Sequence, residues 1–267
     1  MTCRHAAPLV SCVALATVLL APAPPPPGRA SARATLEQAD SLYWSGEPRR
    51  SLELIEAYLG ERPREYEAHW RGARAALSAG LLDGDRSEQR RWLDRGVAHG
   101  EEAVRLSPDG VDGLYWLTAN IGCRSFLLSL RGSARAAQRV YDLSNRVLAL
   151  DPRHAGAHDA LGKLAYRVMR LSALERLLAK ALLGDAALRS ASWETAELHL
   201  RRAVELDPTW LMPHLDLGMA YLHTGRYELA QAELERALGL PPRHPGDLVF
   251  QKEAADAVSY ARARHKP

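Results

Sequence analysis

Small, large and proline residues recur at fixed positions of a 34-residue frame, and this spacing constrains the fold more than any other feature. In the clearest copy, which starts at Leu211, the small residues Gly218 and Ala230 stand at positions 8 and 20, and Pro242 stands at position 32. Small residues let the two helices of a hairpin approach closely, and a proline stops the second helix because it lacks a backbone N–H. The spacing therefore predicts repeated helical hairpins.

This frame is the tetratricopeptide repeat (TPR) pattern, and earlier prolines carry it backward through the chain. The spacings between these prolines are 45, 44, 56 and 34 residues, and the prolines are Pro63, Pro108, Pro152, Pro208 and Pro242. The three longer spacings exceed 34 residues by nearly whole helical turns, which preserves the packing face of a lengthened helix. Aromatic residues make up only 6% of the chain. We expect an all-α, TPR-like α-solenoid of about five helical hairpins, three with lengthened helices, plus a C-terminal capping helix.

The frame also predicts the boundaries of each part. Residues 1–32 are expected to form a signal peptide, residues 33–242 the repeat domain, and residues 245–267 the capping helix and tail. The five units are expected at about 32–65, 66–110, 111–154, 155–210 and 211–244. Side chains at Asp85, Ser133 and Ser192 are expected to cap the second helices of units two to four, and Asp247 to cap the final helix.

Several strings resemble one particular family of TPR-like proteins. They are LYWSGE at 42–47, EAHWRGARA at 67–75, LGKLAYRVMRLSALERLLAKALLG at 161–184 and SWETAELHLRRAVELDP at 192–208. They resemble the regulator of microtubule dynamics family over about residues 35–262. The resemblance implies TPR-like units with similarly lengthened hairpins and an adaptor role. Ala173 stands where the family usually has Trp in its LSW-x-ER segment.

The amino end predicts export. An apolar run at 9–21 is followed by prolines and small residues, as in a secretory signal peptide. This run reaches only about 20 Å as a helix, which is too short to span a membrane. Cleavage is expected after Ala32, with Ala34 and Ala23 as alternatives, and the mature protein is then periplasmic or secreted. A lipoprotein anchored through Cys12 is disfavoured because most of the apolar run follows that cysteine. An exported protein would not meet microtubules, so the family's cytoskeletal activity is not expected here.

The chain carries no pattern typical of catalysis. A net charge of +3 is too small to argue for a nucleic acid or an anionic membrane surface. Glycine-rich phosphate loops, G-x-S-x-G and H-E-x-x-H are absent from the sequence. His154 and His158 share a helical spacing, but no third ligand accompanies them, and Cys123 is expected to be a packed side chain. We therefore expect no enzyme activity, no cofactor and no metal.

The concave surface of a TPR array is lined by positions 2, 5, 9, 12 and 13 of each first helix, and it can receive an extended peptide or a partner helix. These positions predict a partner-binding groove made of Tyr43, Trp44, Trp70, Arg74, Tyr115, Lys163, Tyr166, Arg167, Met212, Leu215, Met219 and Leu222. Aromatic and Arg side chains, which are enriched at binding hot spots, dominate its amino half. In the alternative interpretation, Trp70 and Tyr115 simply pack against a neighbouring helix.

The predicted function is a non-catalytic protein-interaction module, an exported TPR adaptor or scaffold whose partner is another protein or peptide. The alternative is a carrier of an apolar small molecule or lipid, with the long hairpin of unit four as one wall of its pocket. A third interpretation is a dedicated subunit of a transport or envelope-assembly complex. An enclosed apolar cavity of several hundred Å³ favours the carrier, whereas an open groove of aromatic and charged residues favours the adaptor. The partner and the oligomeric state do not follow from the sequence.

Glu175 conflicts with the long helix expected in unit four. Leucines from Leu161 to Leu182 share one helical face with Glu175. A buried carboxylate needs a partner, so we expect an ion pair with one of Arg139, Arg146, Arg201 and Arg202. The family resemblance also implies a Glu-Arg pair at this place. Glu175 either fixes the hairpin or awaits a cationic group of the partner, and a helix break near Ser172 would instead leave it solvated.

Overall fold

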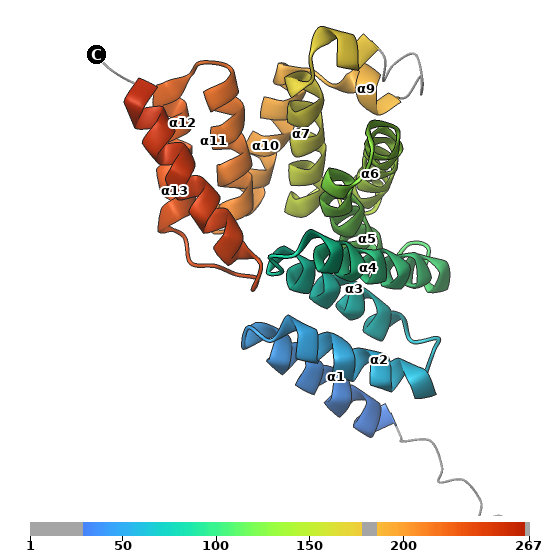
Figure 1. The fold of residues 1–267 in the computed structure, drawn as a ribbon. Helices are drawn as coiled ribbons and strands as arrows, with labels where there is room; N and C mark the ends of the chain where they lie inside the picture. The colour runs from blue at the N-terminus through green and yellow to red at the C-terminus, as the bar shows by residue number, and fades with distance from the viewer. Residues whose placement is uncertain (1–28, 178–185, 265–267) are drawn as a thin grey trace, which may run out of the picture.

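The computed structural model describes residues 29–177 and 186–264, and within these ranges the chain forms helices and no strand (Figure 1). The helices are α1 (Arg29–Trp44), α2 (Pro48–Glu61), α3 (Tyr66–Leu81), α4 (Arg86–Leu106), α5 (Val111–Arg124), the 3₁₀ turn η1 (Ser125–Leu127), α6 (Leu130–Leu150), α7 (Ala155–Arg170), α9 (Ala186–Ser190), α10 (Trp193–Leu206), α11 (Leu211–His223), α12 (Tyr227–Gly239) and α13 (Asp247–Arg264). Hairpins form between α1 and α2, α3 and α4, α5 and α6, α7 and α10, and α11 and α12. The all-α, TPR-like architecture is confirmed.

Glycines at the frame positions allow the close approach that the repeat requires. A methyl group added to Gly218 on α11 would lie 2.6 Å from Cγ of Leu234 on α12, and one added to Gly162 would lie equally close to Leu200. Leu234 and Leu200 are fully buried. Gly46 and Gly225 turn the first and last hairpins with φ of 88° and 74°, which a side chain at either position would disfavour. These glycines therefore fix both the spacing and the turns of the hairpins.

A histidine one turn into the first helix ties three hairpins to the preceding proline. In each case Nε2 faces a proline carbonyl oxygen, at 3.0 Å for His69 and Pro63, 3.3 Å for His158 and Pro152, and 3.1 Å for His214 and Pro208. The other ring nitrogen contacts the second helix of the hairpin, as in His158 and His199, whose Nδ1 atoms are 3.0 Å apart. These histidines join successive repeats.

Two of the expected helix caps are present and two are not. The Asp85 carboxylate accepts hydrogen bonds from the backbone N–H groups of Ser87 and Glu88, and the Ser192 hydroxyl accepts one from Thr195. The prediction for Ser133 is wrong, because Ser129 caps α6 four residues earlier. The prediction for Asp247 is also wrong, because Asp247 is the first residue of α13 and its carboxylate accepts hydrogen bonds from the N–H groups of Arg243 and His244 in the preceding loop.

The continuous long helix expected through Glu175 is wrong. Helix α7 ends at Arg170, and Leu171 is extended. Ser172 and Glu175 then form a reciprocal capping box: Glu175 accepts from the Ser172 N–H at 2.8 Å, and the Ser172 hydroxyl accepts from the Glu175 N–H at 3.2 Å. The Arg176 guanidinium binds the carbonyls of Met169 and Leu171 at the end of α7. Glu175 is therefore exposed, and its pKa is lowered by the hydrogen bonds from Ser172.

The four arginines proposed as partners of Glu175 are engaged elsewhere. The contacts are Arg139 with Glu101 at 2.9 Å, Arg146 with Asp109 at 3.6 Å, Arg201 with Glu197 at 3.8 Å and Arg202 with Glu205 at 3.1 Å. The structural ion pair assigned to Glu175 is therefore wrong, because a local capping box satisfies its charge.

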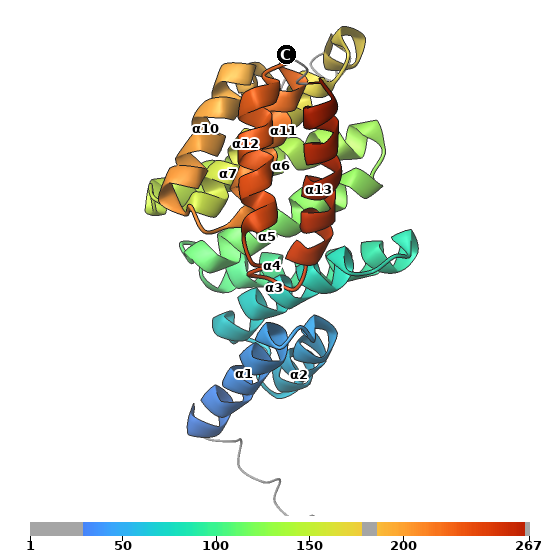
Figure 2. The ribbon, with the colours of Figure 1, turned by 90° about the vertical axis from the view of Figure 1, so that its left-hand side faces the viewer.

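The C-terminal segment returns to the first hairpins. Helix α13 packs against α12 and α11, and the loop ahead of it reaches α1 and α3 (Figures 1 and 2). His244 Nδ1 lies 2.9 Å from the Tyr43 hydroxyl, and a methyl group added to Gly246 would lie 2.8 Å from Leu81. The last helix thus covers α12 and also closes the concave side of the solenoid.

The start of helix α1 bears on the predicted cleavage site of the signal peptide. Helix α1 begins at Arg29, so cleavage after Ala32 would fall inside a helix. Residues 1–28, which contain most of the predicted signal peptide, lie outside the described residues. Among the helices that the structure describes, none has the length and hydropathy to cross a membrane.

Candidate functional site

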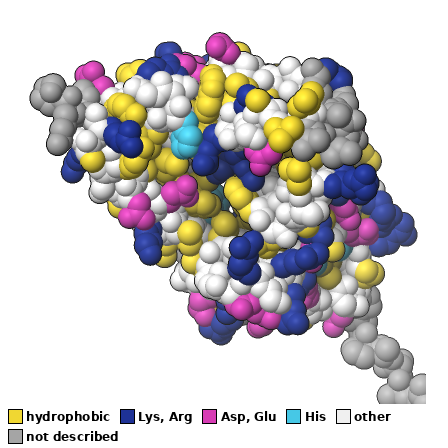
Figure 3. All heavy atoms as spheres, turned by 45° about the horizontal axis from the view of Figure 1, so that its top comes forward, with side chains coloured by type: hydrophobic (Ala, Val, Ile, Leu, Met, Phe, Trp, Pro, Cys, Tyr) yellow, Lys and Arg dark blue, Asp and Glu magenta, His cyan; other side chains and the backbone are white. Residues whose placement is uncertain are grey.

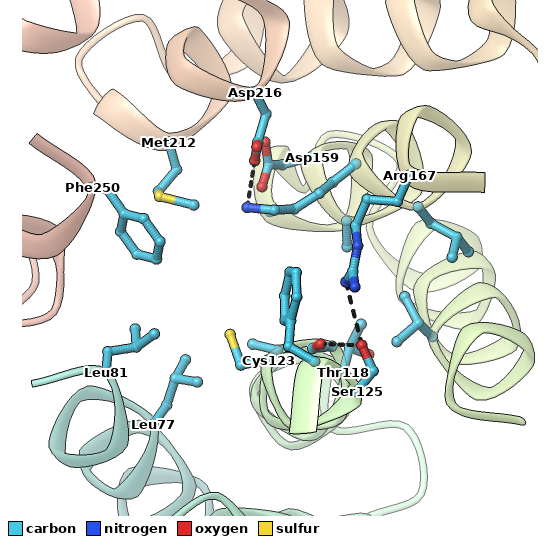
Figure 4. Close-up of a pocket in the computed structure, with 18 of the residues that line it drawn as sticks. Leu77, Leu81, Thr118, Cys123, Ser125, Asp159, Arg167, Met212, Asp216 and Phe250 are labelled. Atoms are coloured by element: carbon cyan, nitrogen blue, oxygen red, sulfur yellow. Dashed lines mark hydrogen bonds and ion pairs between the residues drawn. The ribbon is translucent and has the colours of Figure 1, made fainter. Parts of the chain in front are cut away.

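The concave side of the solenoid encloses a cavity of about 490 Å³, which we call the chamber (Figure 4). Its walls come from α3, α5, α6, α7 and α11, and α13 closes one side. The apolar lining includes Leu77, Leu81, Trp116, Leu164, Met212 and Phe250. A volume of this size, lined mainly by apolar groups with a few polar ones, is typical of small-molecule sites.

A buried polar cluster lies where α7 and α11 face the chamber. Lys163 Nζ is 2.8 Å from the Asp216 carboxylate, and Asp159 is one turn before Lys163 on α7. Burial alone would lower the pKa of Lys163, but the negative charges of Asp216 and Asp159 raise it. Burial raises the pKa of Asp159, and the Asp216 charge raises it further. Lys163 and Asp216 therefore form a buried ion pair, and the carboxyl group of Asp159 lies beside it.

Two buried polar atoms that line the chamber have no hydrogen-bond partner among the described residues. They are Oδ1 of Asp159 and Nε1 of Trp210. Unpaired buried polar atoms cost about 1–3 kcal/mol each. Both atoms therefore offer a hydrogen bond to a polar group of a bound molecule.

Two arginines of α7, Arg167 and Arg170, line one side of the chamber. Arg167 donates a hydrogen bond of 3.3 Å to the Ser125 hydroxyl, and its guanidinium carbon lies 3.5 Å from the centre of the Phe126 ring. Arg170 on the next turn of α7 contacts the Tyr166 hydroxyl at 3.2 Å. Burial lowers the pKa of Arg167, and neither arginine has an ion-pair partner within the described residues. Figure 3 shows Lys and Arg side chains beside a hollow with hydrophobic walls.

The structure divides the predicted groove into three groups. Seven of its residues line the chamber: Tyr43, Tyr115, Lys163, Tyr166, Arg167, Met212 and Met219. Leu215 and Leu222 belong to the buried core around α11 instead. The remaining three residues, Trp44, Trp70 and Arg74, gather outside the chamber.

Arg74 is the centre of this outer group. It is buried, pairs with Asp40, and lies 4.1, 5.1 and 5.3 Å from the ring centres of Tyr43, Trp44 and Trp70. Trp44 is 53% exposed. Arg74 is therefore occupied inside the fold, and Trp44 is the member that a partner reaches most easily.

Sequence reasoning missed Asp159, Asp216 and the wall formed by the C-terminal segment. A signal existed for the two carboxylates, because Asp159 stands four residues before Lys163, and Asp216 lies between Met212 and Met219 on one helical face. Local pattern held no comparable signal for the return of the loop before α13 to the first hairpins.

Comparison with known proteins decides the family. The family described as "Regulator of microtubule dynamics protein 1-3" matches residues 35–261. This chain belongs to that family. Regulator of microtubule dynamics protein 1 of Bos taurus is 27% identical over 225 residues, which cover 84% of this chain and 70% of the bovine protein. The Caenorhabditis elegans protein of the same name is 23% identical and covers 80% of this chain and 94% of its own length.

A solved structure supports the fold. A thermophilic TPR protein of Thermus thermophilus superimposes with a TM-score of 0.59 at 23% identity, over 85% of this chain and 99% of its own. TPR-like solenoids present extended binding surfaces and serve as protein-interaction modules. The superposition therefore supports a TPR-like fold for this chain.

The family overturns the predicted location. The relatives of this chain are animal proteins named as regulators of microtubule dynamics, and microtubules are not exported structures. The prediction of an exported, periplasmic or secreted protein is therefore wrong. An apolar run followed by prolines and small residues resembles a cleavable signal, but that composition is not specific to export.

Proposed function

We propose that this domain binds the apolar chain of an amphipathic small molecule or lipid inside the chamber, with the anionic end of that molecule at Arg167. The observation that carries the proposal is the largely apolar cavity of about 490 Å³ on the concave side, which α13 covers on one side and which stays open to the surface at its mouth. An open groove would favour a peptide, whereas an enclosed apolar space favours a chain that must be kept from water.

The apolar walls and the arginine at the mouth would both contribute to the free energy of binding. Each buried methylene contributes about 0.8 kcal/mol, so a chain of eight to ten carbons contributes several kcal/mol before the costs of association. Arg167 adds a half-buried cation without a carboxylate partner in the described residues. A phosphate or carboxylate of the ligand would supply the missing charge.

The test compares three amphiphiles with the same twelve-carbon chain and different head groups. Titration calorimetry should give tighter binding for dodecyl phosphate than for dodecyl maltoside, and the weakest binding for dodecyltrimethylammonium. Ala160→Phe, which fills the chamber from α7, should abolish binding of all three, and Arg167→Gln should remove only the preference for the anionic head. Ala232→Phe on the exposed face of α12 is the matched control and should change nothing. Equal binding by the folded Ala160→Phe variant would contradict the proposal.

A second candidate function is protein binding at the outer aromatic group of Trp44, Trp70 and Arg74. The exposure of Trp44 favours it, because a half-exposed tryptophan beside an arginine is the composition of a binding hot spot. The TPR-like fold and the regulator names of the relatives support a protein partner. Trp44→Ala should then weaken retention of that partner while leaving amphiphile binding unchanged.

A further inference from the structure

Two large apolar side chains of the chamber lining are exposed, and two more are exposed on the segment that follows α7. Phe126 is 56% exposed, Leu130 45%, Leu174 64% and Leu177 63%. Phe126 and Leu130 themselves line the chamber. Single exposed leucines are ordinary, but Leu174 and Leu177 follow Leu171 of the chamber lining by three and six residues, so the exposed apolar groups gather at the end of α7. We call these four residues, with Arg131, Arg135 and Arg170, the mouth face.

Positive charge predominates around this patch, although the exposed Glu175 lies between Leu174 and Leu177. Between Asp112 and Asp142 the sequence contains four arginines and no acidic residue. Arg124 pairs with Asp94 and Arg139 with Glu101, which leaves Arg131 and Arg135 as the unpaired cations of this stretch among the described residues. Arg131 and Arg135 are exposed, and neither forms an ion pair within the described residues. The acidic side chain nearest in sequence on the α7 side is Glu175, whose carboxylate is held by the Ser172 backbone. The net charge of the whole chain is only +3, so the positive charge is local.

The geometry holds the exposed leucines in place. Arg176 bonds to the carbonyls of Met169 and Leu171 at 2.9 and 2.6 Å, which fixes the short helical segment at 173–177 on the end of α7. Leu171 lines the chamber. Figure 1 shows this segment beyond the end of α7, in the part of the molecule farthest from α1 and α2. Leu174 and Leu177 are thus held on the exposed surface beyond the end of α7.

We propose that the mouth face docks on an anionic membrane surface, with Leu174 and Leu177 entering the acyl boundary and the arginines meeting lipid phosphates. Apolar side chains flanked by arginine are the composition of an interfacial membrane anchor, and anionic lipids attract such a cluster. The inference rests on the proposed function, because docking here places the chamber opening against the bilayer from which an apolar chain would enter.

Vesicle sedimentation of the full chain tests the proposal. We expect binding to vesicles of phosphatidylcholine with phosphatidylserine, weaker binding to phosphatidylcholine alone, and a loss of binding as salt rises from about 0.1 to 0.5 M. Leu174→Ser with Leu177→Ser should weaken binding by about tenfold. Arg131→Gln with Arg135→Gln should remove the preference for anionic vesicles. Leu198→Ser on α10, which is 68% exposed, is the matched control.

Three results would overturn the docking face: no difference between the leucine pair variant and wild type, an equal loss in the Leu198→Ser control, or self-association through the same leucines in place of vesicle binding. Titration with soluble dodecyl phosphate separates this proposal from the proposed function. The leucine pair variant should still bind it, because its chamber is intact. If Ala160→Phe still binds vesicles and also binds dodecyl phosphate as wild type does, ligand binding in the chamber is contradicted and the docking face is not.

Discussion

The Tyr43 hydroxyl and His244 Nδ1, 201 positions apart in the sequence, form a hydrogen bond of 2.9 Å that joins the first helix to the loop before the last. Tyr43 also contacts the Ser78 hydroxyl at 3.1 Å, and the His244 ring packs against Trp44 and Trp116. This contact brings the loop before α13 to the concave side, where Tyr43 and His244 both line the chamber.

Lowering the pH should weaken the contact between Tyr43 and His244. Burial and the positive charges of Arg74 and Arg243 lower the pKa of His244 to about 4, so the folded protein holds the ring neutral. Because the folded pKa is below the ordinary value, the stabilisation is complete above about pH 6.5 and is lost as the pH falls toward 4. Between pH 7 and 5 the free energy of unfolding should fall by about 1–2 kcal/mol through this residue.

Urea unfolding of wild type and His244→Asn at both pH values isolates that contribution, since His99, His154, His158 and His199 also have lowered pKa values from burial and are common to both proteins. The difference in stability between the two proteins should shrink at pH 5. A difference that stays constant with pH would show that His244 does not titrate in this range.

Tyr43→Phe should destabilise the fold by about 1–2 kcal/mol, because it leaves buried Ser78 and His244 without a shared partner while keeping the ring. Thermal unfolding measures the loss. Tyr260→Phe on the exposed face of α13 is the matched control and should leave the melting temperature unchanged. Equal melting temperatures for both variants would mean that the closure contributes no stability.

Lys163→Met should destabilise the protein by about 3 kcal/mol, because it leaves the buried Asp216 carboxylate without its cation. Adding Asp216→Asn should recover a large part of this loss, since the unpaired charge is then gone. A double-mutant cycle from chemical denaturation gives the coupling between the two residues. Additive losses would indicate that the ion pair makes no net contribution.

Glu175→Gln should leave the melting temperature unchanged, because an exposed amide oxygen still accepts the hydrogen bond from Ser172. Arg176→Gln should lower it, since two carbonyls at the end of α7 lose their donor. Differential scanning calorimetry of the two neighbouring variants distinguishes these roles. A marked drop in the melting temperature of Glu175→Gln would instead support the buried ion pair that the sequence predicts.

Much of the fold follows from short-range pattern. Gly218 and Ala230 stand at the small-residue positions of the frame, and Leu234 stands at a large-residue position. The sequence alone therefore predicts the hairpins and the close approach of their helices. The break after α7 has a local signal too, because Ser172 and Glu175 carry the capping-box spacing. Glu175 also shares a helical face with several leucines, and that pattern favours a continuous helix. The capping box prevails because it satisfies the Glu175 carboxylate locally, without burying it against a distant arginine.

The closure and the chamber do not follow from local pattern in the same way. Nothing near His244 in sequence indicates Tyr43, although both residues line the chamber. The predicted groove still contains seven of the residues that line it, since frame positions give the direction of side chains. They do not indicate whether the concave side stays open or closes.

Alkylation of Cys123 tests the central claim most directly, because this thiol lies on the chamber wall. Burial raises its pKa, so its reaction with iodoacetamide should be slow and easily followed by peptide mass spectrometry at mildly alkaline pH. If an apolar chain binds in the chamber, saturating dodecyl phosphate should slow alkylation of Cys123 by about tenfold or more in the folded protein. The same rate with and without dodecyl phosphate would contradict the account.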